Sequence, residues 1–91
     1  MDELTRNAIK QLVMEQVDAL HREGMVRYGG ADRRVTFKQE EAFRLVHQDH
    51  FGLSTTDAAE VAGTTVQDIK QKLMRIAKVA PQLLPILTPS Q

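Results

Sequence analysis

The chain has 91 residues, a length that suits one domain and not two. Its hydrophobic fraction of 42% is enough for a small core. It contains no cysteine, which excludes disulfides and thiolate chemistry, and no apolar run approaches the roughly 18 residues that cross a membrane. The formal net charge is zero, which argues against strong non-specific binding of nucleic acid, because such binding comes from neutralising phosphates.

The charges are unevenly distributed along the chain. Basic residues dominate the segments 22–38 and 66–80, and acidic residues dominate the segment between them. A local basic face is therefore compatible with zero net charge. The first residues, MDELTRN, are acidic and contain no apolar stretch, so we expect no signal peptide and a cytoplasmic location.

Residues 2–24 have the spacing of an amphipathic helix that ends near Gly24. The acidic Asp2 and Glu3 suit the start of a helix, where the dipole favours negative charge. The apolar stripe either packs on the rest of the domain or forms the seam of a homodimer. Its members are Leu4, Ala8, Ile9, Leu12, Val13, Val17 and Leu20.

The segment 25–37 contains Gly29, Gly30 and Asp32, which are residues typical of turns. The apolar residues on either side could pair as a short hairpin, and an irregular loop is the alternative. A phosphate-binding loop is disfavoured because no GK[ST] sequence follows the glycines. The hairpin would pair Val26 and Tyr28 with Val35 and Phe37.

Three further helices are predicted in the segment 36–80. Thr36 and Gln39 have the spacing of a capping box, and Gly52 is expected to end the helix that follows. A short helix over 55–62 should end at Gly63 with positive φ, and Thr64 or Thr65 should cap a helix over 65–80. The tail 81–91 contains prolines and apolar residues, and it either packs on the core or meets a partner.

Two helices joined by a short turn that contains glycine form a helix-turn-helix. The small Ala59 would let the helices cross closely, and Ile69 would anchor the second helix to the first. Burial of the apolar ridge of the second helix leaves an outward face that can bind the edges of bases in a major groove. We expect DNA contacts from Thr55, Thr56, Thr65, Gln67, Asp68, Lys70, Gln71 and Arg75, with phosphate contacts from Arg33, Arg34, Lys38, Lys72 and Lys78.

The run FRLVHQDHFGLSTTDAAEVAGTTVQDIKQKLMRIAK resembles region 4 of bacterial sigma factors, the domain that reads promoter DNA, and the related LuxR-type domains. The resemblance covers roughly residues 37–80 and implies a DNA-binding helix-turn-helix. The matching positions are Gly52, Leu53 and Ser54 at the "GLS" start, Ala59 and Glu60 in the "IAE" segment, then Gly63, Val66, Ile69, Lys70 and Leu73, with Arg75 and Lys78 at the basic end.

Three residues depart from the family pattern or complicate it. Ala58 stands where the family has isoleucine, and Thr64 stands where it has an apolar residue. Asp68 puts a carboxylate on the expected DNA side, where it would repel phosphate but could accept from cytosine N4. No sigma region 2 precedes the domain, so we expect a stand-alone regulator.

Other candidate sites have simpler explanations. His47 and His50 could share a metal ion, but the sequence places no third ligand with them, since His21 lies elsewhere, and their flanks are polar, so we expect them on the solvated surface. Glu40 and Glu41 are interpreted as structural carboxylates in the first turn of a helix, and no metal site is predicted. Met74 could touch a thymine methyl, but a contact between helices is the commoner role for methionine.

The sequence therefore predicts a single all-α domain over residues 1–91, with about four helices. The expected function is sequence-specific binding of duplex DNA in transcriptional control by a cytoplasmic homodimer. The alternative is a helix-turn-helix that binds a protein, such as RNA polymerase or a phage or plasmid assembly component. No enzymatic activity, cofactor, small-molecule substrate or membrane partner is expected.

Overall fold

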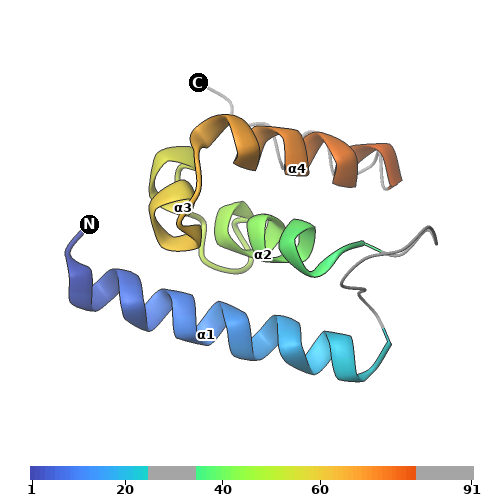
Figure 1. Ribbon diagram of the computed structural model, residues 1–91, viewed down its shortest axis with the longest axis horizontal. Coiled ribbons are helices and arrows are strands. Elements are labelled where there is room, and N and C mark those ends of the chain that lie inside the picture. Colours follow the sequence, from blue (N-terminus) through green and yellow to red (C-terminus); the bar gives the residue numbers. More distant parts are fainter. Residues whose placement is uncertain (25–34, 80–91) are drawn as a thin grey trace.

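The computed structural model describes residues 1–24 and 35–79, which form four helices (Figure 1). The helices are α1 (Glu3–Arg22), α2 (Phe37–Val46), α3 (Thr55–Ala62) and α4 (Val66–Val79). The predicted all-α fold class is therefore confirmed. The suggested hairpin depends on residues 25–34, which lie outside the described residues, as does the apolar tail 81–91. No helix within the described ranges is long and apolar enough to cross a membrane.

Each helix begins directly after a residue that caps it. The Asp2 carboxylate accepts from the Thr5 N–H at 2.7 Å, and the Ser54 hydroxyl accepts from the Asp57 N–H at 3.1 Å. Thr36 makes the predicted capping box with Gln39, with both reciprocal hydrogen bonds present. These bonds satisfy N–H groups that have no partner within the helix, so the starts of the helices are set locally.

The end of α2 differs from the sequence prediction. The helix ends at Val46, and His47 is its C-terminal cap with extended backbone angles, φ −64° and ψ 136°. Gly52 has φ 61° as expected of a turn glycine, but it lies five residues after the cap and donates to the His47 carbonyl at 3.0 Å. The helix stops early because the buried His47 accepts the Asp49 N–H through Nδ1 at 3.1 Å, which closes a turn in place of another helical turn.

The helices form layers, with α2 and α3 between α1 and α4 (Figure 1). Both outer helices pack against both inner ones, and the core fills the space between the layers. Leu45 of α2 and Ile69 of α4 are among the largest side chains that are fully buried. The remaining core residues are Val13 and Val17 of α1, Phe37, Ala42 and Val46 of α2, Ala58, Ala59 and Val61 of α3, and Leu73 and Ile76 of α4.

The apolar stripe predicted on α1 is divided between two faces of the helix. Val13 and Val17 are fully buried against the inner layer. Leu4 is 83% exposed, Leu12 is 49% exposed, and Ala8 between them is also exposed. Neighbouring residues on a helix with 3.6 residues per turn are separated by about 100°, so residues 4, 8 and 12 cannot share the direction of 13 and 17. The prediction of one continuous stripe is therefore wrong.

Candidate nucleic-acid interface

Residues 63–65 join α3 to α4 and fix how α4 leaves the turn. Gly63 lies in the left-handed region with φ 70° and ψ 37°, as predicted. Its N–H bonds the Glu60 carbonyl at 3.3 Å, and the Thr64 N–H bonds the Ala59 carbonyl at 3.0 Å. These bonds satisfy the last carbonyls of α3, so the turn is an ordered part of the fold.

The start of α4 is held by Thr65. Its hydroxyl accepts from the Asp68 N–H at 3.1 Å, and its carbonyl accepts from the Ile69 N–H at 3.1 Å. Of the two predicted caps, Thr65 therefore serves α4. Thr65 is exposed, so its hydroxyl reaches solvent while it caps the helix.

One side of α4 is buried against the inner layer. Ile69, Leu73 and Ile76 are each less than 10% exposed, and Val66 is half-buried. Across the contact, Ala58 and Ala59 of α3 are buried, and their small side chains permit close packing between α3 and α4. The predicted ridge is therefore the side of α4 that packs inside the protein.

The opposite side of α4 faces solvent. Met74 is 62% exposed, so the expectation that it is buried in a contact between helices is wrong. Lys70, Arg75 and Lys78 are exposed and form no ion pair with any residue in the described ranges. The outward face of α4 consists of the exposed residues Gln67, Lys70, Gln71, Met74, Arg75 and Lys78.

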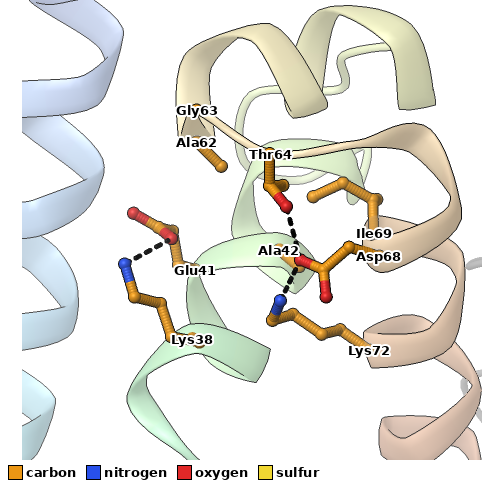
Figure 2. Close-up of a pocket in the computed structure, with 9 residues that line it drawn as sticks. All are labelled: Lys38, Glu41, Ala42, Ala62, Gly63, Thr64, Asp68, Ile69 and Lys72. Atoms are coloured by element: carbon orange, nitrogen blue, oxygen red, sulfur yellow. Dashed lines mark hydrogen bonds and ion pairs between the residues drawn. The ribbon is translucent and has the colours of Figure 1, made fainter.

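Asp68 and Lys72 lie on a flank of α4 and interact with each other. The Asp68 carboxylate accepts hydrogen bonds from the Lys72 ammonium and from the Thr64 hydroxyl, the latter at 2.9 Å (Figure 2). The hydrogen bond from Lys72 is the main cause that lowers the pKa of the Asp68 carboxyl, and the bond from Thr64 is the second. The sequence predicted that Asp68 contacts a DNA base and that Lys72 contacts a DNA phosphate. In the structure the two side chains instead form an ion pair with each other.

Two shallow pockets lie beside this flank and share Asp68 and Lys72 as a common wall. One, of about 260 Å³, lies between the start of α2 and the turn after α3, with Lys38 and Glu41 on its α2 side (Figure 2). The other, of about 200 Å³, lies between Thr36 and Gln39 of the α2 cap and Gln71 and Arg75 of α4. These two pockets are therefore lined mainly by polar side chains, at the margin of the apolar contact between α2 and α4.

The other predicted contacts are spread around α4. Thr55 and Thr56 lie in the first turn of α3, where Thr56 is exposed and Thr55 is half-buried. The Lys38 side chain is 65% exposed on α2, with its Nζ atom 3.9 Å from Oε1 of Glu41. Arg33 and Arg34 lie outside the described residues.

Glu41 is a buried carboxylate that sequence reasoning missed. It is only 3% exposed, and burial raises the pKa of its carboxyl, an effect that the Lys38 ammonium partly opposes. The signal was present in the spacing, because residue 41 stands midway between the buried Phe37 and Leu45 at steps of four. Its neighbour Glu40 forms a conventional ion pair with Arg44 at 3.0 Å.

The histidines also differ in part from expectation. His50 is exposed as predicted, but His47 is buried, and the prediction of a solvated side chain there is wrong. The His47 ring packs 4.8 Å from the Phe43 ring and 5.6 Å from the His50 ring, measured between centroids. Partial desolvation of the His50 ring by its neighbours is the first cause that lowers the pKa of His50, followed by the positive charge of Arg44. No group of three residues placed to hold a metal ion occurs among the described side chains.

Comparison of the chain with protein-family models, with curated proteins and with solved structures gives no match.

Proposed function

We propose that this protein binds duplex DNA sequence-specifically in transcriptional control, with α3 and α4 acting as a helix-turn-helix and α4 entering the major groove. The observation that carries the proposal is the division of α4 into two sides. Ile69 and Leu73 are buried, while Gln67 and Gln71 are exposed together with three basic residues. Such a helix offers hydrogen-bonding groups outward while its apolar side holds it in place.

The dimensions of α4 suit a major groove. Its 14 residues span about 21 Å at a rise of 1.5 Å per residue, and a helix is about 10–12 Å across with side chains. The major groove of B-DNA is about 12 Å wide. The exposed Gln67 at the start of α4 would enter first, with Gln71 one turn further along.

The side chains on α4 match recognised base contacts. A glutamine amide can bond adenine N6 and N7 together, and a lysine ammonium suits guanine O6 and N7. Gln67, Gln71 and Lys70 are the candidates for these roles, and Arg75 and Lys78 are placed further along α4 to contact phosphate. The exposed Thr56 hydroxyl at the start of α3 can donate a hydrogen bond to a phosphate of the DNA backbone, which is where the first helix of a helix-turn-helix makes its contacts.

Zero net charge limits the general attraction of this chain to DNA. Lys70, Arg75 and Lys78 form no ion pair with a described acidic residue, so three exposed basic side chains are gathered on the outward face of α4. We expect modest affinity for random DNA, a shallow salt dependence and a larger contribution from base contacts. We also propose that the protein acts in the cytoplasm.

The test is selection of preferred sites from random duplexes at stated salt, followed by titration of the selected site. The variant Lys70→Ala with Gln71→Ala should weaken binding by a few kcal/mol, because each good base contact is worth about 1–3 kcal/mol. Its Tm should stay near that of the wild type, because both side chains are exposed. The matched control is Asn7→Ala with Lys10→Ala, which removes one exposed amide and one exposed lysine side chain from α1.

A second candidate function is binding to a protein such as RNA polymerase, through the same face of α4. The exposed Met74 favours it, because a flexible apolar side chain amid polar ones is a common anchor in protein interfaces. Selection that enriches no duplex, or a DNA affinity unchanged by the Lys70 and Gln71 substitutions, would favour this candidate over DNA recognition.

A further inference from the structure

The side of α1 that points away from the inner layer carries exposed apolar residues. Leu4, Ala8 and Leu12 follow one another at steps of four, so they share one face of the helix. Leu4 is 83% exposed and Leu12 is 49% exposed, although both are large aliphatic residues. We refer to these three residues as the Leu4–Ala8–Leu12 face.

We propose that the Leu4–Ala8–Leu12 face binds a second copy of this chain, with the two α1 helices antiparallel and a two-fold axis passing beside Ala8. A two-fold interface requires a surface that is complementary to itself. The face meets this requirement because Leu4 and Leu12 stand at equal distances on either side of Ala8. Leu4 then packs against the partner's Leu12, and Ala8 against the partner's Ala8.

The polar residues beside the face repeat this symmetry. Thr5 and Gln11 are exposed, uncharged and each three residues from Ala8, so the axis exchanges one with the other. No like charges are therefore brought together at the centre of the contact. The small Ala8 at the axis lets the two helices approach closely, and antiparallel helices oppose their dipoles favourably.

Glu15 determines which register the two helices adopt. It is exposed about one turn beyond Leu12 on the same side of α1. A two-fold axis beside Leu12 would place Glu15 within the contact, where an unpaired carboxylate is costly to bury. The axis beside Ala8 leaves Glu15 at the edge in solvent, which selects this register.

The contact involves only part of α1, so the dimer is weak. Interfaces below about 1,200 Å² in total belong to the weak and transient class. Pairing should therefore be a concentration-dependent equilibrium between monomer and dimer, with both species folded. The core residues Val13 and Val17 take no part in it because they pack within the monomer.

The layered fold gives this dimer an unusual consequence. Helices α1 and α4 lie on opposite sides of the molecule, with α2 and α3 between them (Figure 1). Each packs its buried residues against that inner layer, so their exposed faces point in opposite directions. Two copies joined through α1 therefore direct their α4 faces away from each other. If α4 binds DNA, a step that rests on the proposed function, the dimer joins two separate duplexes, because it cannot present both α4 helices to one side of a single duplex.

The first test is sedimentation equilibrium of the full chain without DNA, up to millimolar concentration. The wild type should shift from monomer to dimer mass, and the variant Leu4→Glu with Leu12→Glu should remain monomeric, with the Tm of the wild type when both are melted at a dilution at which the wild type is monomeric. Met74→Glu is the control, because it removes an exposed apolar residue from α4 on the opposite side and should still dimerise. A wild type that stays monomeric, a double variant that still dimerises, or a monomeric double variant with a lowered Tm overturns the proposal.

The register is tested by cross-linking, because the chain has no natural cysteine. Ala8→Cys should form a disulfide-linked dimer under mild oxidation, whereas Gln67→Cys on α4 should not. A dimer that Ala8→Cys fails to cross-link overturns the position of the axis. With DNA, two duplexes carrying different labels should be captured together by the wild type and not by the Leu4→Glu, Leu12→Glu variant. Dimerisation without DNA binding would reject the proposed function alone, and DNA binding by a strict monomer would reject the dimer alone.

Discussion

The Thr64 hydroxyl donates a hydrogen bond to the Asp68 carboxylate at 2.9 Å, which links the turn after α3 to the first turn of α4. The same carboxylate also accepts from Lys72, so one acidic side chain connects the turn, the start of α4 and a lysine one turn further on. Asp68 therefore positions α4, and the positive charge of Lys72 is neutralised beside the outward face.

Asp68→Asn should strengthen binding to the selected duplex and increase its salt dependence. The substitution removes a negative charge near the phosphates and leaves Lys72 free to contact one. The same change should lower the free energy of unfolding by about 0.5–1 kcal/mol, because exposed ion pairs and hydrogen bonds contribute little. Glu3→Gln on α1, which removes an equal charge far from α4, should leave DNA affinity unaltered. Weaker binding at a single base position would instead show that Asp68 reads a base.

Any replacement of Gly63 should lower the free energy of unfolding, because its positive φ strains a residue that has a Cβ atom. A Cβ atom at this position would meet no neighbour within 4 Å, so crowding contributes nothing. The φ of 70° nevertheless costs a residue with Cβ about 1–2 kcal/mol, and more when the side chain is β-branched. Urea unfolding should show that the wild type is the most stable, followed by Gly63→Asn, Gly63→Ala and Gly63→Val in that order. Equal stabilities for the Gly63→Asn and Gly63→Val variants would contradict the assigned turn.

Glu41→Gln should stabilise the protein at neutral pH and have little effect in acid. Burial raises the pKa of Glu41, so the folded chain holds this proton at pH values where the unfolded chain has lost it. The contribution of Glu41 to stability therefore falls as pH rises from the ordinary carboxyl pKa to the raised one. A neutral amide removes this dependence, and we expect a gain of about 1 kcal/mol, a typical size for a single substitution.

The control for that measurement is the neighbouring residue. Glu40→Gln breaks the ion pair with Arg44 at 3.0 Å, so it should lower stability at neutral pH where Glu41→Gln raises it. The two variants should be unfolded in urea at several pH values. Parallel pH dependences for the wild type and Glu41→Gln would show that the carboxyl of residue 41 is not the group responsible.

Local chemistry made some features predictable from the sequence. The pair Thr36 and Gln39 and the glycine at 63 act through bonds and angles within a few residues, so their effects follow from spacing alone. The burial of Ile69, Leu73 and Ile76 was likewise correct, because only one face of α4 is strongly apolar. The outward amide-and-lysine face follows from that burial, because the opposite side of the helix must then meet solvent.

Other features depend on tertiary packing, which one sequence does not specify. Glu41 was interpreted as a structural carboxylate in a first helical turn, and its burial was missed although it stands at steps of four from Phe37 and Leu45, because a carboxylate on an apolar face is rarely buried. The apolar residues of α1 were treated as one stripe because their gaps of three and four suit a single helix face. The structure shows two faces, one buried with Val13 and Val17 and one exposed with Leu4 and Leu12. The partners of Asp68 were missed because a charge on the expected DNA side suggested a ligand, whereas Thr64 and Lys72 lie within reach on the same segment.

The shortness of α3 has a consequence for any measurement of affinity. A helix of eight residues is far below the roughly 12–15 that are marginally stable alone, so α3 exists only while its neighbours hold it. The orientation of α4 is therefore a property of the whole cooperative unit. A substitution at Val13, on the far side of the molecule, would lower the population of competent molecules and reduce apparent affinity in proportion, without altering a single recognition group.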